Sequence, residues 1–271
     1  MSVPPITLTA PDGARAEVLD RGGQVIGWTP AGGGERLFFA PRSEYGPGPA
    51  FRGGVPVIWP QFGGFGPLIG HGFARDLPFE LIEGGAAGAL ARGVWRTTDT
   101  PDTRSVWDFP FILTVTVEVG GPRLVVRLAA SNVGERPFTF SAALHTYLRV
   151  ADLAQTTLEG LGGLRYRDHA NGDVYTRQTE PTLRFTGEVD RIYGDAPPRL
   201  RLVEPGRTLT ILAENFPDAV VWTPWDSPRG ITNPEPGGSR RYLCVEAATI
   251  TAPVTLAPGG TWRAAQILIA D

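Results

Sequence analysis

Three histidines and a few carboxylates are the side chains of this chain with the clearest capacity for chemistry. The histidines are His71, His145 and His169, and none stands at the short spacing of a common zinc site such as H-x-H or H-E-x-x-H. The chain has no G-x-S-x-G nucleophile elbow. Its glycine-rich stretch 53–72 does not follow a strand and open a helix, as a dinucleotide-binding loop does. The residues therefore favour acid–base catalysis over metal-dependent chemistry.

Two of the candidates lie on the polar side of segments that alternate like β-strands. In residues 137–150 (PFTFSAALHTYLRV), His145 points away from the apolar face. In residues 240–250 (RRYLCVEAATI), Glu246 points away from an apolar face of leucine, valine and alanine. A sheet with one face in the core and one polar face can build a groove, for which a carbohydrate is a natural ligand.

The elements that must position these side chains are predicted to be strands. Short β-rich segments separated by turn residues recur throughout, among them ITLTA, FILTVTVEV, RLVVRLAAS, TLTILAE and AAQILIA. The 35 glycines and 26 prolines break helices, and only short helical pieces near residues 42–46 and 151–160 are expected. No repeat or long polar linker divides the chain. We therefore predict an all-β fold, with residues 1–271 forming a single-domain antiparallel sandwich.

Composition narrows the class of partner. The formal net charge is −3 and no run of basic residues marks a polyanion footprint, so neither nucleic acid nor an anionic membrane is an expected partner. The single cysteine, Cys244, excludes an internal disulfide, and the N-terminal residues lack the pattern of a signal peptide. No apolar run approaches the ~20 residues of a spanning helix. A cytoplasmic protein, expected to be a monomer, that acts on a small molecule fits these features.

Several ordered blocks of the sequence resemble one known family. The stretch RGGVPVIWPQFG followed by HGFARDLPFEL resembles the signature of the glucose-6-phosphate 1-epimerases, within the aldose 1-epimerase (galactose mutarotase-like) superfamily. The later blocks ALHTYLRV, LEGLGGLRYRD, FTGEVDRIY, VVWTPW and LCVEAATITAPVTLAPGGTW look like the remaining family blocks in the same order. The resemblance implies a β-supersandwich that interconverts the α and β anomers of a phosphorylated hexose without a cofactor.

The resemblance also implies roles for individual residues. Glu246 of the block CVEA looks like the general base that removes the C1 hydroxyl proton, and His145 of LHTY like the general acid at the ring oxygen. Their types suit neutral pH, because histidine titrates near neutrality and burial can raise the pKa of a carboxyl group. His71 of HGFAR would contact the sugar or its ring oxygen, and Asp190 of EVDRIY would hold sugar hydroxyls.

The glycine-rich stretch contains the candidates for phosphate binding. Arginine supplies fixed cationic forks and glycine lets the backbone come close to an anion. Arg52 and Arg75 resemble the phosphate-side arginines of the family, and Gln61 would be a neutral hydrogen-bonding neighbour. In the alternative interpretation the two arginines are surface ion-pair partners, and the aromatic residues of the stretch plug one end of the sandwich.

The sequence departs from the family pattern at two positions. Thr223 stands where the family commonly has asparagine, and His169 stands near a common lysine. Two other functions also remain compatible with the residues. One is an aldose 1-epimerase acting on unphosphorylated sugar, and the other is a carbohydrate-binding protein without turnover, because fold alone does not dictate function.

Overall fold

The structure is a computed structural model and describes residues 4–40, 53–226 and 238–271. Its strands form three antiparallel sheets. The smallest has the order β1-β2-β3. Its strands are β1 (Ile6–Thr9), β2 (Arg15–Leu19) and β3 (Gln24–Thr29).

The second sheet has eight strands in the order β13-β12-β15-β18-β19-β9-β4, with β10 also paired to β19. Its strands are β4 (Val57–Ile58), β9 (Phe138–Leu144), β10 (Tyr147–Arg149), β12 (Arg165–Asp168), β13 (Val174–Arg177), β15 (Val189–Tyr193), β18 (Asp218–Thr223) and β19 (Tyr242–Leu256).

The third sheet has nine strands in the order β14-β11-β16-β17-β20-β8-β7-β6-β5. Its strands are β5 (Glu80–Ala87), β6 (Leu90–Thr98), β7 (Phe111–Gly120), β8 (Arg123–Asn132), β11 (Thr157–Glu159), β14 (Thr182–Arg184), β16 (Arg199–Glu204), β17 (Arg207–Glu214) and β20 (Thr261–Ala270). The prediction of an all-β antiparallel fold is confirmed.

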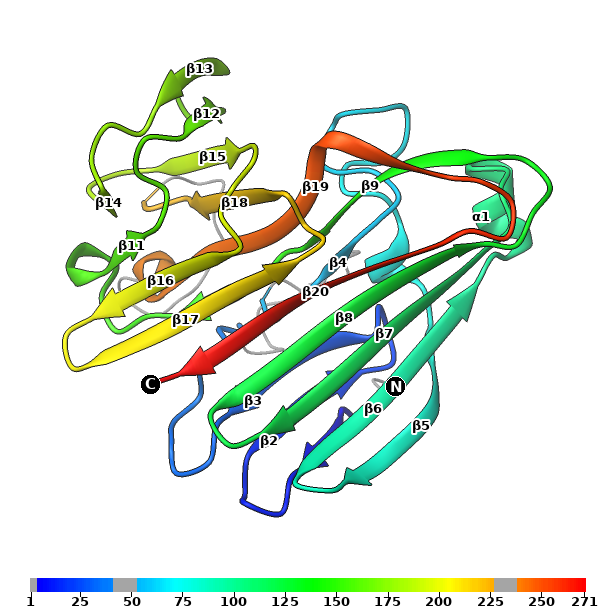
Figure 1. Cartoon of the computed structure of the whole chain (residues 1–271), viewed down its shortest axis with the longest axis horizontal. Helices are drawn as coiled ribbons and strands as arrows, with labels where there is room; N and C mark the ends of the chain where they lie inside the picture. The colour runs from blue at the N-terminus through cyan, green and yellow to red at the C-terminus, as the bar shows by residue number, and fades with distance from the viewer. Residues whose placement is uncertain (1–3, 41–52, 227–237) are drawn as a thin grey trace.

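The two large sheets lie face to face, with the nine-stranded sheet across the front of Figure 1 and β4 and β9 behind it. Alternate residues of their strands share one hydrophobic core, to which β7 contributes Val115, β8 Leu128 and β19 Val245. This core takes in residues from Leu8 to Ala270. The shared core supports the single-domain organisation, which stays a prediction.

Helices are few and short in the described part of the chain. Residues 151–160 contain the 3₁₀ helix η3 (Leu153–Gln155), and the other candidate, residues 42–46, lies outside the described residues. The other 3₁₀ helices of the described residues are η2 (Ala74–Asp76) and η4 (Gly238–Arg241). None of the helices described is long and apolar enough to cross a membrane.

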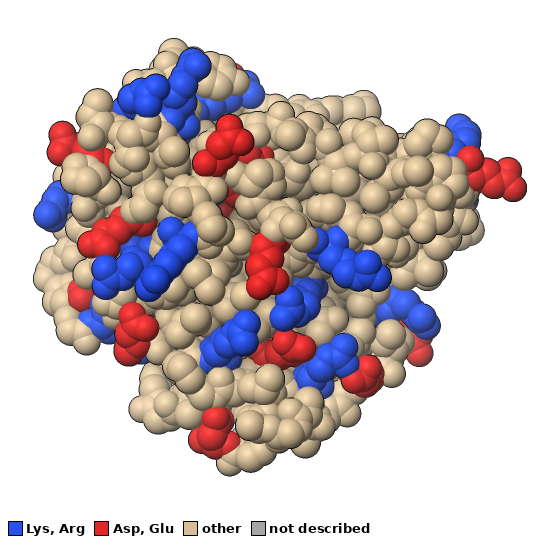
Figure 2. Space-filling model, viewed as in Figure 1, with Lys and Arg blue, Asp and Glu red and all other residues tan. Residues whose placement is uncertain are grey.

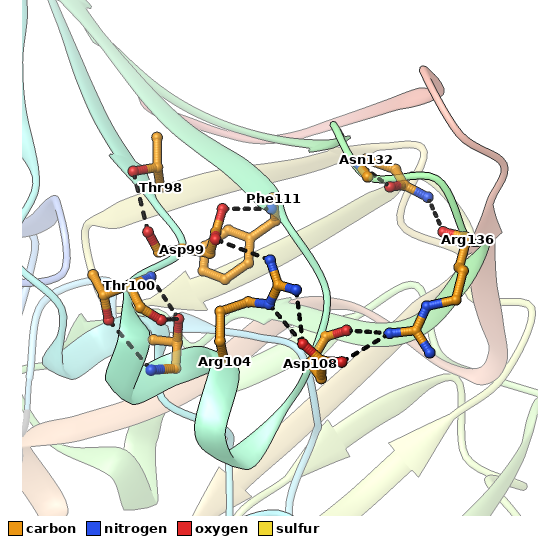
Figure 3. A network of polar contacts seen from close by, with 10 residues as sticks. Thr98, Asp99, Thr100, Arg104, Asp108, Phe111, Asn132 and Arg136 are labelled. Atoms are coloured by element: carbon orange, nitrogen blue, oxygen red, sulfur yellow. Dashed lines mark hydrogen bonds and ion pairs between the residues drawn. The ribbon is translucent and has the colours of Figure 1, made fainter.

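Sequence reasoning missed the α-helix α1 (Pro101–Val106). Thr100 caps it, since Thr103 N–H donates to Thr100 Oγ1 at 3.2 Å and Thr100 N–H donates to Thr103 Oγ1 at 2.8 Å. Figure 3 shows the continuation of this polar network, in which Asp108 accepts from both Arg104 and Arg136. The cap and the proline at the first helical position stabilise this helix. Its six residues are too few to display an apolar period, which is why the sequence pattern did not reveal it.

The outer face of the nine-stranded sheet carries charges of both signs. Figure 2 shows Arg side chains interleaved with Asp and Glu side chains on the face viewed. Arg127 pairs with Glu118 at 3.6 Å and with Glu214 at 3.2 Å, and Arg92 pairs with Glu118 at 3.6 Å. On this face, charges of opposite sign therefore lie close enough to pair with one another.

Candidate active site

A cavity of about 590 Å³ lies over the face of the eight-stranded sheet that turns away from the shared core. Its volume is in the range of pockets that hold small ligands. Most of the side chains proposed from the sequence reach it. The lining residues are Pro56, Phe62, Gly63, Gly64, Phe65, His71, Arg75, His145, Tyr147, Arg167, His169, Asp173, Asp190, Val220, Trp222 and Glu246.

His145 enters the cavity from a break between two strands. The segment read from the sequence as continuous is divided, because β9 ends at Leu144 and β10 begins at Tyr147. At the break the backbone turns to a neighbouring segment: His145 N–H donates to Pro56 O at 2.9 Å and Tyr147 N–H donates to Gly54 O at 2.8 Å. Main-chain contacts at His145 itself and at Tyr147 therefore anchor the backbone at this break.

Glu246 enters the cavity from the middle of β19, as its alternation predicted. Val245 and Ala247 belong to the shared core, whereas Glu246 lines the cavity with 2% of its surface exposed. Burial raises the pKa of the Glu246 carboxyl well above its usual range, and the nearby charge of Asp190 raises it further. Within the described part of the chain, Glu246 Oε2 has no hydrogen-bond partner.

The two proposed catalytic groups are in direct contact. His145 Nε2 lies 3.3 Å from Glu246 Oε1. Aromatic side chains fix the plane of the imidazole. The Tyr147 ring stacks on it with a centroid distance of 4.9 Å and an interplanar angle of 13°. The Trp222 ring meets it edge-on, with a centroid distance of 6.1 Å. The geometry therefore offers an acid and a base side by side on one wall of the cavity.

The glycine-rich segment 53–72 folds over the same cavity and brings His71 into it. The His71 ring lies 5.7 Å from the His145 ring. Gly63 N–H donates to His71 Nδ1 at 3.2 Å, so the proton of the neutral His71 ring is on Nε2. Gly72 is required beside it, because a Cβ there would come within 2.2 Å of Trp59 O.

Gln61 does not line the cavity and instead holds this segment together. It is 4% exposed, its Nε2 donates to Gly63 O at 3.0 Å and to Leu68 O at 3.1 Å, and its Oε1 accepts from Leu68 N–H at 2.9 Å. Its contact with a substrate stays a prediction, and the contacts in the structure favour a role in shaping the segment.

The aromatic residues of the segment divide between core and cavity. Trp59 is fully buried and packs 4.6 Å from the Phe111 ring. Phe62 is also buried but lines the cavity together with Phe65, which is 40% exposed. The segment therefore both covers the end of the sandwich and forms a wall of the cavity.

Two arginines reach the cavity within the described residues. Arg75, proposed from the sequence, is one of them, and its Nη2 donates to Gly70 O at 3.3 Å. Arg52 lies outside the described residues. Arg167, which sequence reasoning did not single out, is the second; it lies 4.7 Å from the centroid of the Phe65 ring.

Two residues depart from the family pattern. His169 lines the cavity, and Thr223 does not. His169 Nδ1 is 3.1 Å from Asp173 Oδ1, and the same carboxylate accepts from Arg167 Nε at 2.6 Å. The hydrogen bond from Arg167 lowers the pKa of the Asp173 carboxyl. Thr223 is fully buried and its Oγ1 accepts from Trp225 N–H at 3.1 Å.

Asp190 reaches the cavity from β15, as proposed. Tyr147, Trp222 and Arg167 line it as well but were assigned no role from the sequence. Strand alternation carried a signal for Tyr147, because it shares a face with His145. For Trp222 and Arg167 no local pattern distinguishes a cavity wall from a surface position.

Acid–base chemistry does not need a metal, and the donors in this cavity are not grouped for one. Among residues 4–40, 53–226 and 238–271, no cluster of three or more His, Cys, Asp and Glu side chains is placed to hold a metal ion. A larger hollow of about 820 Å³ near Trp262 is lined by no imidazole or carboxylate.

Comparison with known families decides the kind of protein that this cavity belongs to. The model of the aldose 1-epimerase family matches residues 4–268. The chain belongs to the aldose 1-epimerase family. It is therefore an isomerase of the epimerase type, and the family resemblance inferred from the sequence is confirmed.

Relatives within the aldose 1-epimerase family cover most of the chain. A protein of Cenchrus ciliaris with the provisional name glucose-6-phosphate 1-epimerase is 34% identical over 261 residues, which is 92% of this chain and 79% of the relative. A structure from Salmonella typhimurium, provisionally described as a mutarotase, has a TM-score of 0.87 and 27% identity, and covers 98% of this chain and 90% of that one.

The fold extends to more distant proteins. A galactose mutarotase-like protein from Lactobacillus casei has a TM-score of 0.77 and 17% identity. The match covers 98% of this chain and 100% of that chain. The predicted galactose mutarotase-like supersandwich is thereby confirmed.

Proposed function

We propose that this protein interconverts the α and β anomers of a hexose 6-phosphate, such as glucose 6-phosphate. The contact of His145 Nε2 with Glu246 Oε1 at 3.3 Å inside a ligand-sized cavity is the observation that carries the proposal. Opening a hemiacetal requires a base at the C1 hydroxyl and an acid at the ring oxygen. Because both oxygens are bonded to the same carbon, the acid and the base must be neighbours.

In the proposed reaction Glu246 takes the proton of the C1 hydroxyl while His145 gives a proton to the ring oxygen, and the C1–O5 bond breaks. Rotation about C1–C2 presents the other face of the aldehyde, and the reverse proton transfers close the ring as the second anomer. A carboxylate of raised pKa suits this role, because proton exchange is most efficient when the pKa of the base is near the working pH. His71 and Asp190 would hold the sugar from the surrounding wall.

The proposed phosphate group lies against the arginine side of the cavity. Arg75 and Arg167 supply guanidinium groups there, and the name of the Cenchrus ciliaris relative is that of an enzyme for a phosphorylated sugar. Arg52 is expected to join them, as its resemblance to the family implies. Activity as a monomer stays a prediction.

The test compares the exchange of anomers of glucose 6-phosphate and of glucose by NMR magnetisation transfer. Arg75→Gln is expected to raise the KM for glucose 6-phosphate about tenfold or more, because a hydrogen bond between charged groups is worth roughly 1.5–3 kcal/mol. The KM for glucose should change little. Arg201→Gln is the matched control, since Arg201 pairs with Glu159 at 2.9 Å on the other large sheet. Equal loss on both sugars would favour an aldose 1-epimerase for unphosphorylated sugar.

A carbohydrate-binding protein without turnover fits the site less well. Such a protein gains nothing from an acid in contact with a base, and a carboxyl group buried like that of Glu246 is costly to keep. If the wild-type protein binds glucose 6-phosphate but leaves the exchange of its anomers at the uncatalysed rate, the catalytic proposal is wrong.

A further inference from the structure

One buried amide joins the two large sheets directly behind the candidate active site. Gln266 lies on β20 of the nine-stranded sheet and is 2% exposed. Its Nε2 donates to Val245 O at 2.9 Å, and its Oε1 accepts from Thr146 Oγ1. Val245 precedes Glu246 and Thr146 follows His145, so each end of this amide holds the residue next to one member of the pair.

The strand break at His145 explains why the Val245 carbonyl needs such a partner. In the ladder between the strands, Ala247 lies opposite Leu144 and Cys244 lies opposite Tyr147. The two residues between them on β19 therefore face the break rather than a regular strand. Val245 N–H is satisfied across it by Thr146 O at 3.1 Å. The Val245 carbonyl is satisfied from the opposite sheet by Gln266.

The orientation of the amide is set by chemistry. A carbonyl oxygen can only accept, so the NH₂ group of Gln266 must face Val245 and its oxygen must face the Thr146 hydroxyl. Thr146 is fully buried, and its hydroxyl also lies 3.5 Å from Leu144 O, a longer contact than its bond to Gln266. Removing the Gln266 amide would leave the buried Val245 carbonyl without this bond, which is unfavourable.

We propose that Gln266 is a positioning residue for the His145–Glu246 pair. It acts from the opposite sheet and holds the two backbone segments at the separation that leaves the side chains in contact. Position 266 is otherwise part of a β20 face that packs on the shared core, to which Ala264 and Leu268 belong. A residue whose only task was packing would be expected to be apolar there, as its neighbours on this face are. The inference rests on the proposed function, because it takes His145 and Glu246 as the acid and the base.

Two substitutions break the bridge from opposite ends. Gln266→Met keeps the length of the side chain and removes both of its hydrogen bonds. Thr146→Val keeps the shape of its side chain and removes the bond from the Thr146 hydroxyl to Gln266 Oε1. We expect either to lower kcat between about 10- and 100-fold, because a displacement of about 1 Å at reacting groups can cost that much. KM should stay within about threefold, since Gln266 and Thr146 do not line the cavity. Thr146→Ser keeps the hydroxyl and should recover most of the kcat lost in Thr146→Val.

The double variant separates one shared bridge from two independent defects. Gln266→Met combined with Thr146→Val should cost little more kcat than Gln266→Met alone, because Gln266→Met already removes the one bond that Thr146→Val breaks. Asn132→Leu is the matched control: Asn132 is a buried amide that donates to Arg136 O and Leu256 O at 2.8 and 3.0 Å, away from the cavity. It should lower Tm by a similar amount and leave kcat within about twofold of wild type.

A second readout does not depend on activity. The ring-proton NMR signal of His145, assigned by its loss in His145→Asn among three histidines, should shift in folded Gln266→Met. The same signal should stay in place in Asn132→Leu. If both the His145 signal and kcat of folded Gln266→Met match the wild type, the positioning role is refuted. If the wild-type protein exchanges no anomers yet the His145 signal still shifts in Gln266→Met, the positioning role stands and the proposed function falls.

Discussion

Glu246 and Asp190 line the same cavity, and the charge of Asp190 adds to the effect of burial in raising the pKa of the Glu246 carboxyl. Two carboxyl groups of one site then have different environments, because Glu246 is 2% exposed whereas Asp190 is half-buried. This difference suits a division of labour in which the buried carboxyl exchanges protons and the other holds the sugar.

Removal of the Asp190 charge should therefore shift the pH dependence of catalysis. In Asp190→Asn the pKa of Glu246 falls, and the acidic limb of the profile of kcat/KM against pH is expected to move to lower pH. Asp173→Asn is the control, because Asp173 lines the cavity but does not contribute to the pKa shift of Glu246. If the acidic limb stays in place in Asp190→Asn, the limb does not report the titration of Glu246.

Either member of the proposed acid–base pair should be indispensable. Glu246→Gln and His145→Asn are each expected to lower kcat by about 100-fold or more, since positioned proton transfer contributes roughly 10²–10⁴ to a rate. Both variants keep the approximate shape of the side chain, and circular dichroism checks that they fold. Anomer exchange at the wild-type rate in either variant would show that the assigned mechanism is wrong.

The Glu246 carboxyl should also make the stability of the protein depend on pH. Its pKa is higher in the folded chain than in the unfolded chain, so above its ordinary pKa the folded state retains a proton that the unfolded state has released. The contribution of Glu246 to the free energy of unfolding therefore falls as pH rises from about 4.5 toward the folded pKa, by up to about 1.4 kcal/mol per pH unit.

Comparison of Tm between wild type and Glu246→Gln across this pH range measures the effect. The variant should gain stability relative to wild type as pH rises, because a neutral amide has no charge to bury. A difference in Tm that is the same at every pH would mean that Glu246 titrates alike in the folded and unfolded chains.

Gln61 should affect the shape of the cavity wall rather than the chemistry. Gln61→Leu removes its bonds to Gly63 O, Leu68 O and Leu68 N–H, and is expected to lower the free energy of unfolding by about 1–3 kcal/mol. KM should rise more than kcat falls, because Phe65 and His71 stand on the segment that Gln61 holds.

The matched control for this change is Gln155→Leu. Gln155 donates to Asp152 Oδ2 at 3.0 Å in an exposed position, so its loss should change stability by less than about 0.5 kcal/mol. Chemical denaturation measures both variants. A Gln61→Leu protein as stable as Gln155→Leu would contradict the role assigned to the Gln61 amide.

Much of the fold could be predicted because strand patterns are local. Period-two alternation identified strands such as β7, β8 and β20, and it assigned His145 and Glu246 to faces opposite the core. The helix α1 escaped this reasoning because its signal is a cap and a proline rather than a period. Residue types alone also favoured acid–base chemistry over metal or serine chemistry.

What the sequence determined by itself is the direction of each side chain within its own strand, because neighbouring residues must point to opposite faces of a sheet. Only the tertiary structure decided which strands lie side by side. The register that sets Ala247 opposite Leu144, and the break that follows it, bring His145 to Glu246, and no local pattern encodes that pairing. The same holds for Gln266. Its own strand shows only a polar residue among core residues, and its hydrogen-bond partners lie on the opposite sheet.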